Sequence, residues 1–185
     1  MLRLSNIEKR FYVGTPHENQ LYQDLNIHIQ DGEFITVIGS NGSGKSTFFN
    51  IIAGTLQPDQ GSILFKGQDI AHLPEHLRSR HIARVYQDPL KGTAPSLTIL
   101  ENLSMAYNKG KKFNLSRGVD QSLLEHFKHE LKSLNLGLED KLNNRVGTLS
   151  GGQRQALSLL MATMVQPELL LLDEHTAALD PKTSE

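Results

Sequence analysis

The residues with the clearest chemistry occupy positions 39–46, where the sequence reads Gly-Ser-Asn-Gly-Ser-Gly-Lys-Ser. They match the pattern G-x-x-x-x-G-K-[S/T] at every defined position. Glycines allow backbone angles at which successive N–H groups turn inward around phosphate oxygens. A helix that begins near Lys45 points the positive end of its dipole at the same oxygens. The spacing therefore predicts a loop that binds nucleotide phosphates, here called the phosphate loop.

Two side chains of the phosphate loop have predicted roles of their own. Lys45 is placed to bridge the β- and γ-phosphates, and the Ser46 hydroxyl is placed to ligate Mg²⁺. A glycine-rich turn that fits the pattern by chance is the alternative, but a strand before it and a helix after it supply the context that a phosphate loop requires. The predicted nucleotide-binding set here is Gly39, Ser40, Asn41, Gly42, Ser43, Gly44, Lys45, Ser46 and Thr47.

An acidic pair follows a second apolar run. Residues 169–172 are four leucines, and Asp173 and Glu174 come directly after them. In parallel α/β sheets, ligands bind at the carboxyl ends of the strands. Asp173 is therefore predicted to hold the Mg²⁺ shell, and Glu174 to polarise the water that attacks the γ-phosphate. A strand that simply ends in solvated acids is the alternative, and the phosphate loop makes it the weaker one.

A third segment, Leu-Ser-Gly-Gly-Gln-Arg-Gln at positions 149–155, distinguishes between classes of phosphate-loop protein. It resembles, residue for residue, the L-S-G-G-Q signature of ATP-binding cassette (ABC) proteins. Ser150 and the two glycines form another anion-binding helix start. One domain has no need of a second cradle for the same phosphate, so we expect Ser150, Gly151, Gly152 and Gln153 to close over ATP bound by a partner subunit.

The resemblance covers nearly the whole chain and implies further site residues. Gln87 is similar to the family's Q-loop glutamine, which contacts Mg²⁺ and the attacking water and senses the transmembrane partner. Asp180 resembles the D-loop aspartate, which contacts the opposing subunit. Phe11 lies where the family places an aromatic residue that stacks on adenine, with Tyr12 as the alternative. The implied catalytic set is Glu174, Gln87 and Lys45, and the implied metal ligands are Ser46, Gln87 and Asp173.

Two departures from the family pattern concern the end of the chain. His175 stands where the family usually has proline after the catalytic glutamate, and we interpret it as a tolerated variant. The sequence ends at Glu185, before the position of the family's switch histidine. We therefore expect a C-terminally incomplete cassette whose ATP binding tolerates the missing part better than its hydrolysis does.

The elements that must position these residues follow from the hydrophobic pattern. Alternation predicts antiparallel strands at 2–7 and 25–29, and a continuous apolar run at 34–38 predicts a strand buried on both faces. Helices are predicted at about 45–53, in two or three pieces between 97 and 136, and after Ser150. Further strands are predicted at 62–65, 82–86 and 169–172. The prediction is an α/β fold, a P-loop NTPase core with a mixed sheet and antiparallel N-terminal strands plus an inserted helical subdomain.

We expect residues 1–86 and 150–185 to form the nucleotide-binding core of a single domain and residues 87–149 to form the helical subdomain. The 185 residues suffice for a sizeable core, and 38% apolar and 21% charged residues are ordinary for a globular protein. A formal net charge of −1 gives no general attraction to nucleic acid. There is no cysteine, so disulfides and thiolate metal sites are excluded.

These observations and the resemblance imply an ATP-hydrolysing transporter subunit with ATP and Mg²⁺ as its ligands. The implied partners are a second cassette, permease subunits and a substrate-binding protein, without nucleic acid. No apolar run is long enough to cross a bilayer, so permease subunits must hold the protein on the cytoplasmic face of the membrane. Two alternatives stay open: a cassette ATPase of DNA repair or translation, and a regulatory module that binds nucleotide with little hydrolysis.

Overall fold

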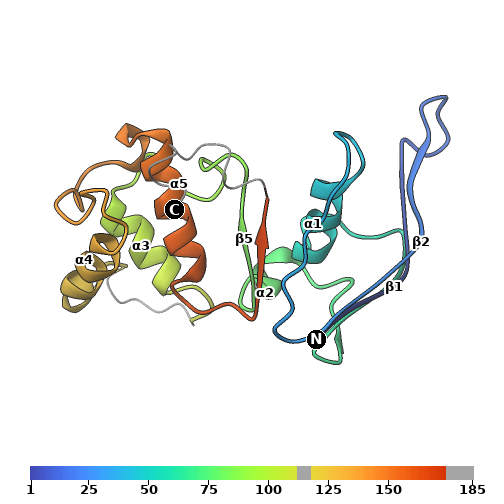
Figure 1. The fold of residues 1–185 in the computed structure, drawn as a ribbon, viewed down its shortest axis with the longest axis horizontal. Coiled ribbons are helices and arrows are strands. Elements are labelled where there is room, and N and C mark those ends of the chain that lie inside the picture. The colour runs from blue at the N-terminus through green and yellow to red at the C-terminus, as the bar shows by residue number, and fades with distance from the viewer. Residues whose placement is uncertain (112–117, 174–185) are drawn as a thin grey trace. The chain divides into compact units, whose positions relative to one another are not determined.

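The computed structural model describes residues 1–111 and 118–173 of the chain. These residues form two compact units, one up to Ser79 and one from Arg80 onward. Figure 1 labels their helices and strands in chain order. Each unit is described by itself below.

The first unit is built on a four-stranded sheet of order β2-β1-β3-β4. Its strands are β1 (Leu2–Phe11), β2 (Asn19–Ile29), β3 (Gln60–Phe65) and β4 (Gln68–Asp69). Neighbouring strands are antiparallel, and Leu2 pairs with Ile29 on one side and with Phe65 on the other. The alternating sequence pattern predicted both N-terminal strands, because β1 buries alternate residues and β2 half-buries them. Both strands are longer than the predicted ranges 2–7 and 25–29.

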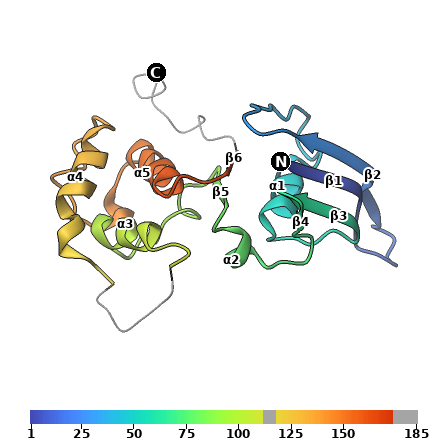
Figure 2. The ribbon, with the colours of Figure 1, turned by 90° about the horizontal axis from the view of Figure 1, so that it is seen from below.

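Helix α1 (Lys45–Ala53) covers one face of this sheet, as Figures 1 and 2 show from two directions. Its buried residues are Phe48, Ile51, Ile52 and Ala53. The helix ends where Gly54 adopts a left-handed conformation with φ of 87°, and the N–H of Gly54 bonds to Asn50 O. A short helix, α2 (Glu75–Arg78), completes the unit. The sequence predicted both ends of α1 correctly.

The predicted buried strand at residues 34–38 is not found. This segment belongs to neither sheet of the described chain, and both Phe34 and Ile38 are 90% exposed. An apolar run is suited to burial but does not supply the neighbouring strand to which its backbone groups must bond. The prediction failed because pairing depends on residues outside the run.

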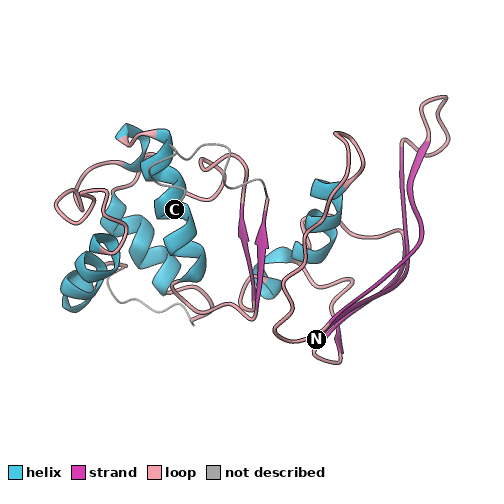
Figure 3. Cartoon of the chain, in the orientation of Figure 1, coloured by secondary structure: helices cyan, strands magenta, loops and turns pink. Residues whose placement is uncertain are grey.

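The second unit combines a pair of parallel strands with helices, shown by type in Figure 3. Its strands are β5 (Ile82–Val85) and β6 (Leu169–Leu172), and its helices are α3 (Ile99–Tyr107), α4 (Leu124–Lys132) and α5 (Gly151–Thr163). Short 3₁₀ turns occupy Gln121–Leu123 and Val146–Thr148. The predicted strand positions and the division of residues 97–136 into separate helices are confirmed.

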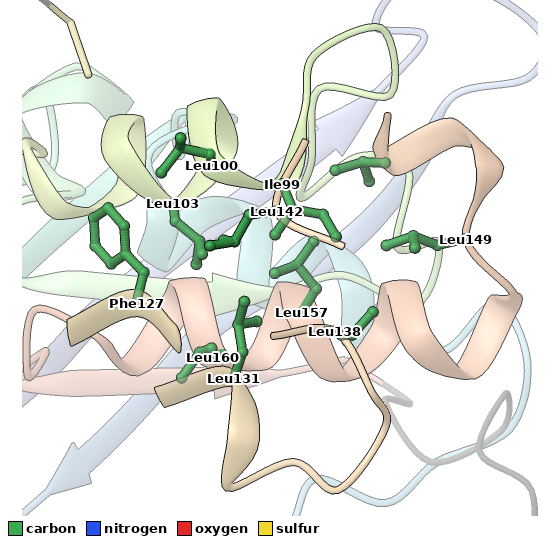
Figure 4. Packing of buried hydrophobic residues seen from close by; sticks show 11 residues of the cluster. Ile99, Leu100, Leu103, Phe127, Leu131, Leu138, Leu142, Leu149, Leu157 and Leu160 are labelled. Atoms are coloured by element: carbon green, nitrogen blue, oxygen red, sulfur yellow. The ribbon is translucent and has the colours of Figure 1, made fainter. Parts of the chain in front are cut away.

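A cluster of buried leucines, together with Ile99, Phe127 and Val146, holds these helices together (Figure 4). Phe127 and Leu131 of α4 are fully buried, as are Leu103 of α3 and Leu157 of α5. Leu149, which opens the signature segment, belongs to the same cluster and is 5% exposed. The signature segment is therefore anchored in the helical core at its first residue.

Within the described residues, no helix has the length and apolar character needed to cross a membrane.

Candidate nucleotide site

The phosphate loop turns into helix α1 through glycines in left-handed conformations. Gly42 has a φ of 82° and Gly44, the N-cap of α1, has a φ of 96°. L-residues with a side chain rarely adopt these angles, so the glycines are required here. Within the described part of the chain, no side chain caps the start of α1. Its first amides are thus left for a ligand, as a phosphate site needs.

Lys45 lies folded over the phosphate loop. Its Nζ donates to Gly39 O at 2.7 Å and to Ser40 O at 3.0 Å. The ammonium is therefore held by carbonyl oxygens of the loop itself, and the far stronger charge of a phosphate can draw it away. Ser46, the next residue, is exposed, so its hydroxyl is accessible to a ligand.

The C-terminal end of α1 is bonded to Arg78, a contact that the sequence analysis did not predict. Arg78 is 2% exposed, and its guanidinium donates to four backbone carbonyls. Two belong to the last turn of α1, Ile51 O at 2.7 Å and Ile52 O at 3.0 Å. The others are Ala71 O at 2.9 Å and Leu73 O at 2.8 Å. Burial lowers the pKa of Arg78, and nearby Asp69 opposes that shift. Arginine is not deprotonated in proteins, so its side chain places a cation at the negative end of the helix dipole.

Asp173 and Gln87 follow the carboxyl ends of adjacent parallel strands in the second unit. Because Val85 of β5 pairs with Leu172 of β6, the two strands end at the same level. The N–H of Asp173 extends the ladder by bonding to Val85 O at 3.1 Å. Gln87 lies two residues beyond β5 and is exposed. The prediction that Asp173 follows a strand of a parallel sheet is confirmed.

Arg84 of β5 forms an ion pair with Asp173, which the sequence analysis missed. The Nη2–Oδ2 distance is 2.9 Å, and the two side chains are 8% and 13% exposed. The Arg84 guanidinium also lies 4.6 Å from the ring centroid of Tyr86. A charged residue inside a four-residue apolar strand was the available signal, because such residues are seldom buried without a partner.

The signature segment starts helix α5 with a capping box. The Ser150 Oγ accepts the N–H of Gln153 at 3.2 Å, and the Gln153 Oε1 accepts the N–H of Ser150 at 3.2 Å. The Gln153 Nε2 also donates to Leu136 O at 3.2 Å. Both Ser150 and Gly151 are exposed. The segment is thus an accessible turn in which the Ser150 hydroxyl accepts a bond and still has a proton to donate.

The two aromatic candidates for adenine lie at the end of β1. Phe11 is its last residue and is half-buried, with the Lys9 Nζ 5.6 Å from the ring centroid. Tyr12 follows in a left-handed conformation with φ of 56° and is 71% exposed. Both rings thus offer some accessible surface to a base.

The structure brings the predicted residues together as three groups. Residues 39–47 form one group in the first unit, while Gln87 with Asp173 and the signature residues Ser150–Gln153 form two groups in the second. Glu174, His175 and Asp180 lie outside the described residues.

Comparison with known proteins identifies the family. The profile of a family described as ABC transporter matches residues 22–177. The chain belongs to this family. A tyrosine transport ATP-binding protein of Clostridioides difficile (strain R20291) is 47% identical over 184 residues, covering 100% of this chain and 73% of the relative. The phosphonates import ATP-binding protein PhnC of Alcaligenes faecalis is 33% identical, covering 100% of this chain and 66% of the relative.

A solved structure supports the same assignment for this cassette. The dimeric post-hydrolysis state of the ATP-binding cassette MJ0796, bound to ADP and Pi, matches with a TM-score of 0.83 and 29% identity over 99% of this chain and 78% of that chain. The predicted α/β P-loop fold is therefore confirmed. So is the prediction of an ATP-binding and ATP-hydrolysing transporter subunit, over a cassette of DNA repair or translation.

Proposed function

We propose that two copies of the cassette bind two ATP molecules, each between the phosphate loop of one copy and the signature segment of the other. The observation that best supports this proposal is that the chain has two accessible helix starts suited to anions, at Gly44 and at Ser150. The solved cassette that it resembles was captured as a dimer with ADP and Pi. A second anion-binding helix start in each copy has a use when that copy also closes over the ATP bound by its partner.

Within this site we assign each predicted residue one task. The loop amides and Lys45 bind the β- and γ-phosphates, Gln87 orients the attacking water, and Glu174 accepts its proton. Asp180 contacts the partner copy, and Phe11 stacks on adenine, with Tyr12 as the alternative. Binding by ring face carries little base specificity.

Mg²⁺ is proposed as the metal of this site. The candidate ligands are the Ser46 hydroxyl, the Asp173 carboxylate and the Gln87 amide oxygen, and oxygen ligands are the ones that Mg²⁺ prefers. The ion would neutralise charge on the phosphates of bound ATP. The Arg84 pair holds the Asp173 carboxylate at the edge of the β5–β6 pair, ready for that task.

We propose that the closed dimer does mechanical work on permease subunits through the helical subdomain, residues 87–149. The nucleotide-binding core is then residues 1–86 and 150–185. In this arrangement the protein lies on the cytoplasmic face of the membrane, held there by the permease, and a substrate-binding protein delivers the cargo. We infer an amino acid as the cargo class, because the relative that is 47% identical carries the name of a tyrosine transport protein. We infer import because the relative PhnC carries the name of an import protein.

Glu174→Gln in the full-length protein tests this function, because the amide keeps the shape of the carboxyl group but cannot accept the proton. We expect ATP binding to persist, hydrolysis to fall by about 10²-fold or more, and dimer to accumulate with ATP and Mg²⁺. ATPase assays and light scattering measure these effects, with Glu125→Gln at an exposed position of α4 as the control. Unchanged hydrolysis by Glu174→Gln removes this residue from the proton-accepting role, and wild-type protein without ATPase activity favours a regulatory module.

A further inference from the structure

The carbonyl group of Gly44 accepts two hydrogen bonds in the first unit. The N–H of Phe48 donates to it at 2.8 Å, which closes the first turn of α1. The Tyr22 hydroxyl of β2 donates to the same oxygen at 2.6 Å. A side chain of the sheet is therefore bonded to the residue at which the phosphate loop becomes a helix.

Tyr22 fits closely against Gly44. A Cβ atom built on Gly44 would lie 2.8 Å from the Tyr22 hydroxyl and 3.1 Å from a Leu21 methyl carbon. Adjacent side chains of a regular strand point to opposite faces, yet these two both reach the same glycine. The reason is a register shift, since Lys9 pairs with Tyr22 while Arg10 pairs with Gln20, which leaves Leu21 as an extra residue.

This bond differs in kind from the other hydrogen bonds of the loop. The N–H of Ser43 bonds to Ser40 O at 3.2 Å, and Lys45 Nζ bonds to Gly39 O and Ser40 O, so these bonds join the loop to itself. Three glycines in the loop raise the entropy lost when it adopts one conformation. A donor on a sheet strand lowers that cost by holding the loop from outside.

Burial raises the pKa of the Tyr22 phenol above its ordinary value, against a smaller opposite effect of the Phe48 amide. The hydroxyl is therefore protonated at neutral pH and remains a donor. Phenylalanine at this position would keep the ring but lose the bond to Gly44.

We propose that Tyr22 is a positioning residue for ATP binding, whose hydroxyl holds the Gly44 turn so that the loop amides are in place before the nucleotide arrives. The inference rests on the proposed function of the phosphate loop and deepens it. Preorganisation of this kind strengthens binding by removing an ordering cost, and the proton transfers of hydrolysis do not involve it. The effect should therefore fall on KM and not on kcat.

The test compares wild type, Tyr22→Phe and the control Tyr107→Phe in the full-length protein. Tyr107 lies on α3 in the second unit, where its ring packs edge-on against Phe127 at 5.9 Å. For Tyr22→Phe we expect the KM for ATP to rise about threefold to tenfold, the range expected for one hydrogen bond, with kcat within about twofold. Tyr107→Phe should change neither quantity.

Hydrogen–deuterium exchange without nucleotide provides a readout independent of turnover. Amides of residues 44–48 should exchange several times faster in Tyr22→Phe than in wild type, because the Gly44 carbonyl keeps only one donor. An unchanged KM together with unchanged exchange overturns the inference, and so does a fall in kcat as large as the rise in KM. If the wild-type protein itself fails to bind ATP, the proposed function fails first, and the two failures are thereby distinguished.

Discussion

Helices α1 and α5 both begin at glycine-rich segments that we assign to ATP, yet their first turns are stabilised in opposite ways. The start of α5 is capped by its own residues, since Ser150 and Gln153 exchange hydrogen bonds. The start of α1 has the left-handed Gly44 as its N-cap and, within the described residues, no side-chain cap. The capping box of α5 already satisfies the Gln153 amide, whereas among the residues that the structure describes the first amides of α1 have no side-chain cap and are left for a ligand.

The supports of α1 come from elsewhere in the first unit. Tyr22 holds the Gly44 carbonyl at one end, and Arg78 holds Ile51 O and Ile52 O at the other. A helix that must leave its N-terminal amides for phosphate is thus fixed at points that do not compete with phosphate. The start of α1, which we propose binds ATP in its own copy (the binding turn), is therefore anchored differently from the start of α5, which we propose closes over the partner's ATP (the closing turn). Substitutions at each helix start can test this difference.

The largest effect on stability is expected at Arg78. Arg78→Met keeps a long apolar stem but leaves four backbone carbonyls without their donor. We expect the free energy of unfolding to fall by about 3–4 kcal/mol, because each buried acceptor loses a bond to a charged group. Urea denaturation measures it, with Arg3→Met on the exposed side of β1 as a control that should stay within about 0.5 kcal/mol. Equal losses in both variants would contradict the anchoring role.

The next largest effects are expected from glycine substitutions, which compare the two helix starts. Alanine at Gly44 must adopt a φ of 96° and place its Cβ 2.8 Å from the Tyr22 hydroxyl, so we expect a loss of about 2–3 kcal/mol and much weaker ATP binding. Gly42→Ala has the same backbone strain without a contact within 4 Å, and about 1 kcal/mol is expected.

Gly151→Ala at the start of α5 completes this series. Gly151 has neither a left-handed φ nor a neighbour within 4 Å of an added Cβ, so stability should change by less than about 0.5 kcal/mol. Thermal unfolding and nucleotide titration measure all three variants. A Gly151→Ala protein as unstable as Gly44→Ala would end the distinction between the two helix starts.

Local patterns predicted those elements whose ends are determined locally. The bounds of α1 followed from the sequence because Gly44 and Gly54 both adopt left-handed conformations that interrupt a helix. Helix α5 followed from Ser150, whose capping geometry needs only the next three residues. The paired strands at the N-terminus followed from alternation because β1 buries alternate residues and β2 half-buries its apolar ones.

The contacts that the sequence did not reveal join residues far apart in the chain. Tyr22 and Gly44 are 22 residues apart, and Arg84 and Asp173 are 89 residues apart. Patterns of local residue spacing do not predict contacts between residues so far apart in the chain. The apolar run at 34–38 failed for a related reason, because its composition is compatible with a strand but contains no information about a neighbouring strand.

A last pair of substitutions concerns two serines that have different roles at the two helix starts. Ser150→Ala removes the cap of α5, so we expect a loss of about 1 kcal/mol in unfolding free energy, while ATP binding to the separate monomer stays unchanged. Ser46 lies in the first turn of α1 and, in the described part of the chain, makes no side-chain hydrogen bond. Ser46→Ala should therefore cost less than about 0.5 kcal/mol but weaken nucleotide binding with Mg²⁺ more than without it.

Chemical denaturation and nucleotide titration with and without Mg²⁺ separate the two serines, each variant being the control for the other. If Ser46→Ala lost stability as Ser150→Ala does, the hydroxyl of Ser46 would be a structural cap and the start of α1 would not be reserved for a ligand. If Ser150→Ala left stability unchanged, the capping bonds of α5 would contribute nothing beyond what water offers. Opposite outcomes for the two variants are what a binding turn and a closing turn require.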